Sequence, residues 1–233
     1  MTIHIHPTAP LAERVLLPGD PGRALRLAQA LLDAPAMFNH NRGLWGYTGA
    51  GADGRALTIQ STGMGGPSAA IVIVELAELG ARRLVRVGTC GALAPELELG
   101  QLIVVRDALP RDGTSVALGA DDPVRPDAEL TQALVDAAGA GASSGSIVSS
   151  DLFYDLPNGE AGAWRRSGAL AVEMETATLF ALARRRGLQA ASLLAVSDVT
   201  QPAAARIGPD ALIAAELRLG DVAAEALSRL ADS

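Results

Sequence analysis

The sequence contains no lysine, and all 19 of its basic residues are arginine. This absence excludes a phosphate-binding lysine of the Walker type, a Schiff-base cofactor site and a lysine general base. Cysteine occurs once, as Cys90, which excludes an internal disulfide and any zinc site built from several cysteines. One cysteine is typical of a reducing compartment, so we expect a cytoplasmic location.

Histidine is scarce as well, with three residues that all lie in the first 40 positions. His4 and His6 have no nearby acid, so we expect no metal site. No Gly-x-Ser-x-Gly elbow is present, which argues against a serine nucleophile. The chain also lacks a signal-like N-terminus and any apolar run long enough to span a bilayer, so we expect a soluble protein with no membrane partner.

Size and charge limit the function further. The chain has 233 residues, 49% of them hydrophobic, and a formal net charge of -7. That length and apolar content suit one large core, so we expect a single domain over residues 1–233. The acidic balance would repel nucleic acid, and we expect no nucleic-acid partner.

Short strand-like runs alternate with longer helix-like runs, which is the pattern of an α/β protein with a central parallel or mixed sheet. We expect strands over residues 14–17, 56–60, 84–88, 102–105, 146–149, 170–172 and 191–196. Helices are expected over 23–32, 69–79, 127–138, 176–186 and 209–230, with 139–145 as a loop.

Two acids, Glu173 and Glu175, stand between a strand-like and a helix-like apolar run, where both would be buried. An ionised carboxylate is costly to desolvate unless it is paired or hydrogen-bonded. At least one of these acids therefore needs a bound partner. A polyol with adjacent hydroxyls, such as ribose, would be one.

Three arginines, Arg23, Arg42 and Arg86, lie beside glycine-rich turns or strand ends. Glycines let backbone N–H groups approach an anion, and guanidinium groups bind its oxygens in pairs, so we interpret this set as an oxyanion site. Arg86 is the most informative because it interrupts an apolar strand. The structural alternatives are a solvated arginine for Arg23 and a structural ion pair for Arg86.

The turn over residues 63–68 is similar to a dinucleotide-binding turn, but Ser68 replaces the third glycine and no acid ends the following strand. We expect its amides to face a small ligand instead. Asp198 follows a buried strand and is a candidate general acid, with a turn or cap residue as the alternative. Phe153 either stacks on a planar base or fills the core.

Seven segments resemble, in order, the motifs of the hexameric nucleoside phosphorylases: residues 17–24, 41–43, 63–68, 86–92, 150–154, 172–177 and 196–198. That family includes bacterial purine nucleoside phosphorylase, uridine phosphorylase and the archaeal methylthioadenosine-cleaving enzymes. The resemblance implies a three-layer α/β/α fold around a mixed sheet. It also implies a hexamer, a trimer of dimers, in which each site is completed by a neighbouring subunit.

The resemblance assigns roles to residues. Those for phosphate are Gly19, Arg23, Arg86 and Thr89, with Arg42 from the adjacent subunit. Those for ribose are Glu175, Met174 and, across the dimer, His4 in preference to His6. Those for the base are Phe153, Glu173 and Ser197, with Asp198 as the proton donor to N7 of a purine. The resemblance also implies that no metal or organic cofactor is needed and that inorganic phosphate is a co-substrate.

The expected activity is phosphate-dependent cleavage of purine nucleosides to free base and ribose 1-phosphate. Asp198 favours purines, because the uridine enzymes have a different residue there. Arg206 either assists Asp198 or is a solvated loop arginine, and both interpretations are open. Uridine phosphorylase, methylthioadenosine phosphorylase, a hydrolytic nucleosidase and a nucleoside-binding protein without turnover are the alternatives.

Overall fold

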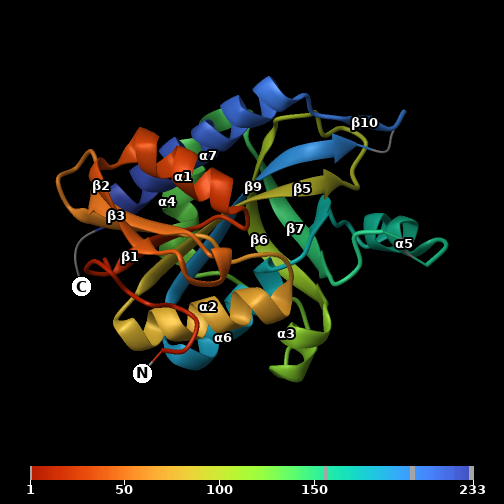
Figure 1. Ribbon diagram of the computed structural model, residues 1–233. Helices are drawn as coiled ribbons and strands as arrows, with labels where there is room; N and C mark the ends of the chain where they lie inside the picture. Colours follow the sequence, from red (N-terminus) through yellow and green to blue (C-terminus); the bar gives the residue numbers. More distant parts are fainter. Residues whose placement is uncertain (1, 155–156, 200–202, 231–233) are drawn as a thin grey trace.

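The fold is organised around one ten-stranded mixed sheet in a computed structural model, which describes residues 2–154, 157–199 and 203–230 (Figure 1). Its order is β10-β9-β6-β7-β8-β5-β1-β4-β3-β2, and β9 pairs with β5 as well as with β6. This extra pairing closes β5, β9, β6, β7 and β8 into a ring. The strands are β1 (Arg14–Leu17), β2 (Asp33–Asn39), β3 (Gly46–Ala50), β4 (Ala56–Gln60), β5 (Arg83–Ala92), β6 (Leu102–Arg111), β7 (Ser143–Ser150), β8 (Ala171–Glu173), β9 (Gln189–Val199) and β10 (Ala205–Arg206).

Helices cover both faces of the sheet, and each face has its own apolar core (Figure 1). One face carries α1 (Pro21–Leu31), α4 (Ala128–Ala138) and α7 (Pro209–Arg229); the other carries α2 (Gly66–Leu79), α3 (Gly113–Ala117) and α6 (Thr176–Arg186). The remaining elements are α5 (Glu160–Arg166), which stands at one side, and the short turns η1 (Asn41–Gly43) and η2 (Gly139–Gly141). The predicted three-layer α/β/α fold around a mixed sheet is confirmed.

Local sequence explains where the principal helices begin and end. Asp20 accepts a hydrogen bond from the backbone N–H of Arg23, and Pro21 occupies the first turn of α1. Asp127 caps α4 in the same way. Gly187 ends α6 in the left-handed conformation, which a glycine adopts without steric cost. Asp20 thereby fixes the sharp turn from β1 into α1.

Most predicted elements are present, and the differences lie in strands at or next to the two sheet edges and in short helical elements. The strands over 14–17 and 56–60 and the helix over 176–186 match residue for residue. The prediction missed β2, β3, β10, α3 and α5, and the predicted loop over 139–145 contains η2 and the start of β7. β2 was not predicted because most of its residues are exposed, so its sequence shows no alternation of apolar and polar residues. The strand is also irregular, since Ala34 has a positive φ.

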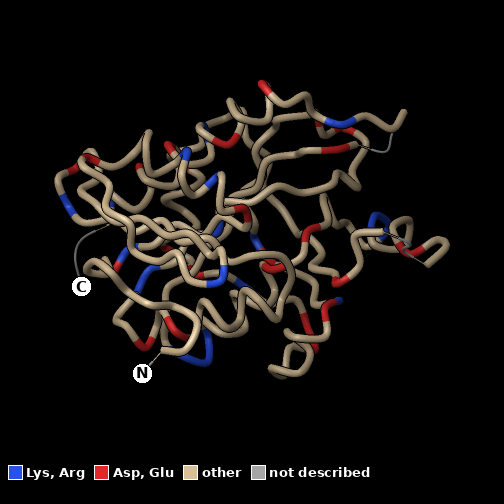
Figure 2. Tube along the Cα trace, in the orientation of Figure 1, with Lys and Arg blue, Asp and Glu red and all other residues tan. Residues whose placement is uncertain are grey.

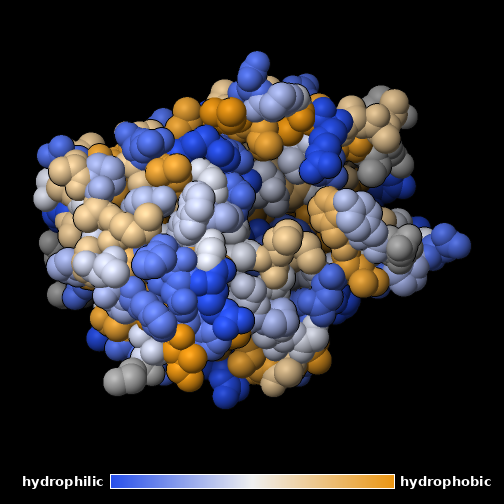
Figure 3. All heavy atoms as spheres, in the orientation of Figure 1, coloured by the Kyte–Doolittle hydropathy of each residue, from blue (hydrophilic) through white to orange (hydrophobic). Residues whose placement is uncertain are grey.

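Charges of both signs are spread along the described trace (Figure 2). Hydrophobic patches are visible at several separate places on the face seen in Figure 3, and the exposed apolar side chains include Met64, Ile3 and Phe153. None of the helices formed by the described residues is long and apolar enough to cross a bilayer.

Candidate functional site

Four parallel strands bring their carboxyl ends to one edge of the sheet. β1 pairs in parallel with β4 and with β5, and β5 pairs in parallel with β9. Gly19 and the turn over 61–66, which follow β1 and β4, therefore lie at the same edge as the carboxyl-terminal halves of β5 and β9, which contain Thr89 and Asp198. Ligands of α/β proteins bind at such edges, so this edge is the candidate site.

A turn rich in glycine follows β4 and leads into α2. Gly63 and Gly65 both have positive φ values, 73° and 82°, which side chains rarely adopt. The N–H of Gly63 donates to the carbonyl of Gly19 at 3.0 Å, which ties this turn to the one after β1. The N–H of Gly65 donates to Glu175 Oε1 at 2.5 Å. We expected the amides of this turn to face a small ligand, and in this structure the Gly65 amide binds a side chain of the same chain.

Arg86 is buried between the two acids of the 173–175 segment. Its Nε donates to Glu173 Oε2 at 2.8 Å, and its Nη2 lies 2.5 Å from Glu175 Oε2. All three side chains are less than a tenth exposed. A Cβ on Gly88 would lie 2.7 Å from Arg86 Nη2, so the glycine two residues along β5 leaves the room that the guanidinium occupies.

Glu173 also stabilises the start of α6. Its carboxylate accepts from the backbone N–H groups of Glu175 and Thr176 and from the Ser149 hydroxyl. An anion at a helix N-terminus is favoured by the helix dipole. The side chain of Glu173 is 1% exposed and has protein partners at both oxygens; its predicted position beside the base stays a prediction.

Glu175 differs from Glu173 in having fewer partners. Burial raises the pKa of Glu175, while the positive charge of Arg86 and the Gly65 hydrogen bond oppose that shift. Each carboxylate oxygen has one recorded protein partner and keeps a lone pair for a further donor. Glu175 is therefore suited to accept hydrogen bonds from a sugar diol.

Arg23 approaches the same site from α1. Its charge contributes to the environment of Glu175, and its Nη1 donates to the carbonyl of Val87 on β5 at 3.1 Å. Its Nε donates to Glu216 of α7 at 2.9 Å. Arg26 binds the other oxygen of Glu216 at 2.6 Å. Both arginines therefore act on Glu175, Arg86 through a direct ion pair and Arg23 through its nearby charge.

Asp198 lies farther along the same edge, near the end of β9. Its carboxylate accepts a hydrogen bond from the Ser197 hydroxyl at 2.7 Å. A Cβ on Gly91 would lie 3.0 Å from Asp198 Oδ1, so the second glycine of the β5 motif makes space for this acid. Arg206 is the register partner of Asp198 in the antiparallel pairing of β10 with β9, which puts both side chains on one face of the sheet.

The remaining predicted residues are more open. Thr89 and Met174 are half-buried. Phe153 is 57% exposed and contacts Tyr154 edge to face, with ring centroids 4.8 Å apart. Arg42 is exposed with a φ of 58°, and no ion pair to it is recorded among residues 2–154, 157–199 and 203–230. The predicted role of each in binding stays a prediction.

His4 lies apart from this cluster, beside α2. Its Nδ1 is 2.8 Å from Glu75 Oε1. Burial alone would raise the pKa of Glu75, but hydrogen bonds from Ile5, His4 and Ile3 outweigh it and hold that pKa at about 2. The sequence analysis missed both Glu75 and Glu216. Glu216 has the pattern of one polar position in an amphipathic helix, whereas Glu75 interrupts the apolar run of α2, a signal of the kind that singled out Arg86.

The single cysteine, Cys90, is buried in the sheet. Burial raises the pKa of the Cys90 thiol well above its ordinary value, so Cys90 is a thiol rather than a nucleophilic thiolate. Within the described parts of the chain, no three His, Cys, Asp or Glu side chains are grouped as metal ligands would be.

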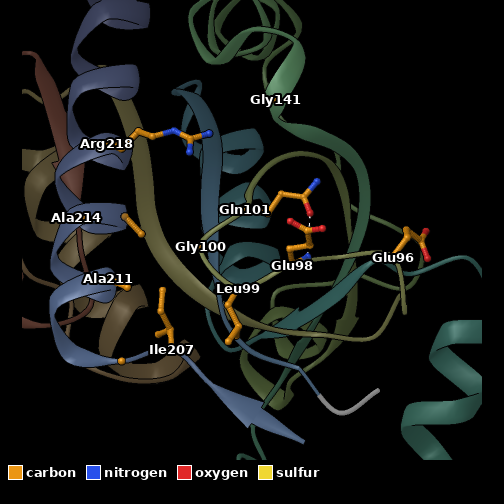
Figure 4. A pocket seen from close by; sticks show the side chains of 12 residues that line it. Glu96, Glu98, Leu99, Gly100, Gln101, Gly141, Ile207, Ala211, Ala214 and Arg218 are labelled. Carbon is orange, nitrogen blue, oxygen red and sulfur yellow. Dashed lines mark hydrogen bonds between the residues drawn. The ribbon is translucent and has the colours of Figure 1, made fainter. Parts of the chain in front are cut away.

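A separate hollow of about 770 Å³ lies between α7 and the segment over 96–101 (Figure 4). Its lining is mainly small or apolar residues of the two segments, with Arg218 on one side and Glu96 and Glu98 on the other. It contains none of the predicted site residues and no buried ion pair. Although this hollow is large, its lining lacks the charged groups that the predicted chemistry needs at its centre, so we do not take it as the candidate site.

Comparison with known proteins agrees with the motifs. The sequence model of the phosphorylase superfamily matches residues 13–232. A DeoD-type purine nucleoside phosphorylase of Geobacillus kaustophilus is 39% identical over 206 residues, covering 85% of this chain and 86% of the relative. A guanosine phosphorylase of Halorubrum lacusprofundi is 41% identical over 188 residues, covering 79% and 77%. A second DeoD-type enzyme, from Clostridium beijerinckii, is 38% identical over 205 residues, covering 85% and 86%.

Proposed function

Because this chain belongs to the phosphorylase superfamily, we propose that it is a purine nucleoside phosphorylase, a pentosyltransferase that splits purine nucleosides with inorganic phosphate. Its similarity to DeoD-type purine nucleoside phosphorylases and to a guanosine phosphorylase supports this activity. The products are free base and ribose 1-phosphate. We propose that inorganic phosphate is a co-substrate and that the reaction needs no metal or organic cofactor.

One observation carries the proposal: two buried arginines and a buried acid with spare hydrogen-bonding capacity lie at the carboxyl edge of the sheet. Arg23 and Arg86 suit an oxyanion, and Glu175 suits a diol. Water as the nucleophile would need no arginines, so a hydrolytic nucleosidase is disfavoured. A binding protein without turnover would need no acid at Asp198.

The mechanism follows from the charges that develop. A phosphate oxygen forms a bond to C1′ as the bond from C1′ to N9 of the purine breaks, so the sugar gains positive charge and the base gains negative charge. Phosphate held by Gly19, Arg23, Arg86 and Thr89 stabilises the sugar, and Asp198 donates its proton to N7. Ser197, and Arg206 from the facing strand, orient Asp198.

Glu175 binds the ribose hydroxyls in this proposal, with Met174 against the sugar and Phe153 over the base. Glu173 contributes by holding Arg86 and the start of α6. Arg42 and His4 serve the site of a neighbouring subunit in a hexamer. A cytoplasmic location, inferred from the single cysteine, is part of the same proposal.

The test is a panel of inosine, guanosine, adenosine, uridine and methylthioadenosine, each with phosphate and with sulfate at equal ionic strength. We expect purine release only with phosphate, with one ribose 1-phosphate formed per base. Equal rates in sulfate would favour the nucleosidase. Faster cleavage of uridine or methylthioadenosine would favour one of those phosphorylases, and light scattering at six chain masses would support the hexamer.

A further inference from the structure

The N-terminal segment lies beside α2 (Figure 1). One buried acid of that helix, Glu75, fastens the segment to it. Glu75 Oε2 accepts from the backbone N–H groups of Ile5 at 2.7 Å and His4 at 2.9 Å. Glu75 Oε1 accepts from the N–H of Ile3 at 3.1 Å and lies 2.8 Å from His4 Nδ1. One carboxylate therefore fixes both the backbone around His4 and its imidazole.

This contact decides which nitrogen of His4 carries the proton in the neutral ring. An ionised carboxylate can only accept hydrogen bonds, so Nδ1 must donate to Glu75. The other nitrogen, Nε2, is then left with a lone pair. The His4 side chain is 25% exposed, and no partner for Nε2 is recorded within the described residues.

His6 lacks this arrangement although it is only two residues away. Its side chain is exposed, and its Nε2 lies 3.0 Å from the carbonyl of Ile3, to which it must donate. No acid is recorded beside His6 in the described structure. Of the two histidines, His4 alone has its tautomer fixed by a carboxylate.

The geometry also says which site His4 can reach. Glu75 is ten residues beyond Gly65, the residue that binds Glu175, so it lies about 15 Å away along the axis of α2. An imidazole held at Glu75 cannot span that distance to the sugar site of its own chain. It is available to a second copy of the chain.

We propose that Glu75 is a positioning residue that fixes His4 as a hydrogen-bond acceptor through Nε2. This inference rests on the proposed function, in which His4 serves the sugar of a neighbouring subunit, and it adds the residue that makes that contact favour a 5′-hydroxyl over a 5′-alkylthio group. A hydroxyl donates to Nε2, whereas a thioether sulfur has no proton to give.

The first experiment needs no substitution. The value of kcat/KM is measured at saturating phosphate for inosine, 5′-deoxyinosine and 5′-deoxy-5′-fluoroinosine, with adenosine analogues if adenosine is the better substrate. Fluorine resembles a hydroxyl in size but donates no hydrogen bond. We expect inosine to exceed both analogues by about threefold to tenfold, as one hydrogen bond allows. A fluoro analogue cleaved as well as inosine would overturn the acceptor role.

The second experiment compares variants of the full chain. Glu75→Gln and His4→Ala should each reduce the preference for inosine over 5′-deoxyinosine to less than twofold, while the KM for phosphate stays within twofold. The double variant should lose no more than His4→Ala alone. Glu78→Gln, the same change at an exposed position of α2, and His6→Ala should keep the wild-type preference.

The outcomes separate this inference from the function beneath it. If no nucleoside is cleaved in a phosphate-dependent way, the proposed function is wrong, and the inference about Glu75 is wrong as well. If cleavage is phosphate-dependent but Glu75→Gln leaves the 5′-hydroxyl preference intact, only the role of Glu75 is wrong. If Glu75→Gln does not fold, the tautomer of His4 is measured in the wild-type chain from its imidazole nitrogen NMR shifts, and a proton on Nε2 rather than on Nδ1 would overturn the role of Glu75.

Discussion

Arg86 Nη2 lies 2.5 Å from Glu175 Oε2, so the arginine proposed to hold phosphate is paired with the acid proposed to hold ribose. The same guanidinium also binds Glu173. A ligand that engages both residues must share this pair or loosen it. The nucleoside and phosphate sites are therefore coupled through a single ion pair.

Replacing Arg86 should affect phosphate binding and stability together. In Arg86→Gln, the KM for phosphate should rise at least tenfold, because the neutral amide cannot form a charge-assisted pair with phosphate. Glu173 and Glu175 would lose their shared cation, which should cost about 3–5 kcal/mol of unfolding free energy. Phosphate titrations and urea unfolding measure the two effects. An unchanged phosphate KM would remove Arg86 from the site.

Gly88→Ala tests the space that Arg86 occupies without removing any charge. A Cβ at this position would lie 2.7 Å from Arg86 Nη2, so the guanidinium must move. We expect kcat/KM for phosphate to fall about tenfold or more, as a displaced charged contact would require. Gly141→Ala is the matched control, since a Cβ there meets nothing within 4 Å. Equal activity of both variants would contradict this account of the glycine.

Asp198 and Arg206 face each other across β9 and β10, which allows their roles to be separated. Asp198→Asn should lower kcat for inosine by about 10²–10⁴-fold, the range typical of general acids. 7-Methylguanosine, whose base leaves without protonation at N7, should lose far less. If Arg206 assists Asp198, Arg206→Ala should also lower kcat more for inosine than for 7-methylguanosine, but by a smaller factor than Asp198→Asn. A uniform loss on both substrates would count against the acid role.

Much of the site was predictable because its residues stand beside glycines. Arg86, Gly88, Gly91 and Asp198 belong to two short motifs, and the structure explains their spacing, since each glycine clears room for one functional side chain. Parallel strands then bring their carboxyl ends together. The alternation of strand-like and helix-like runs predicts such a parallel arrangement, and with it a site at the carboxyl ends of the strands.

The supporting residues were not predictable for a physical reason. Glu216 lies 193 residues from Arg23 in sequence, and Glu75 lies 71 residues from His4. Glu216 lies in an amphipathic helix, where an acid more often faces solvent, and the apolar sequence around Glu75 indicates a buried acid without indicating its partner. Only the packing of α7 on α1, and of the N-terminal segment on α2, reveals what these acids bind.

Glu75 should make stability depend on pH. Its pKa is about 2 in the folded chain, below its ordinary value of 4.5, so its contribution is present above pH 4.5 and is lost as the pH falls toward 2. The contribution is at most about 3 kcal/mol. Glu75→Gln should be less stable than wild type at pH 7, and urea unfolding should show the difference shrinking between pH 4.5 and 3. Glu78→Gln should show no such trend, and a constant difference for Glu75→Gln would refute the assignment.

Charge balance makes the proposed phosphate site depend on a second subunit. Three arginines, Arg23, Arg26 and Arg86, are ion-paired with four acids, Asp20, Glu173, Glu175 and Glu216. With every group ionised, this set carries one net negative charge within one chain. A phosphate dianion therefore needs a further cation, and Arg42, exposed in the turn after β2, is proposed to supply it from a neighbouring subunit.

Subunit mixing tests that dependence directly. Arg42→Ala should raise the KM for phosphate about tenfold or more, whereas Arg218→Ala, an exposed arginine of α7, should not. Arg42→Ala chains and Arg86→Gln chains are then unfolded together and reassembled. If Arg42 acts across the interface, some mixed sites combine an intact Arg86 with an intact Arg42, and part of the wild-type phosphate affinity returns. If both arginines act within one chain, no mixed site is intact, and the mixture is no more active than the average of the two variants.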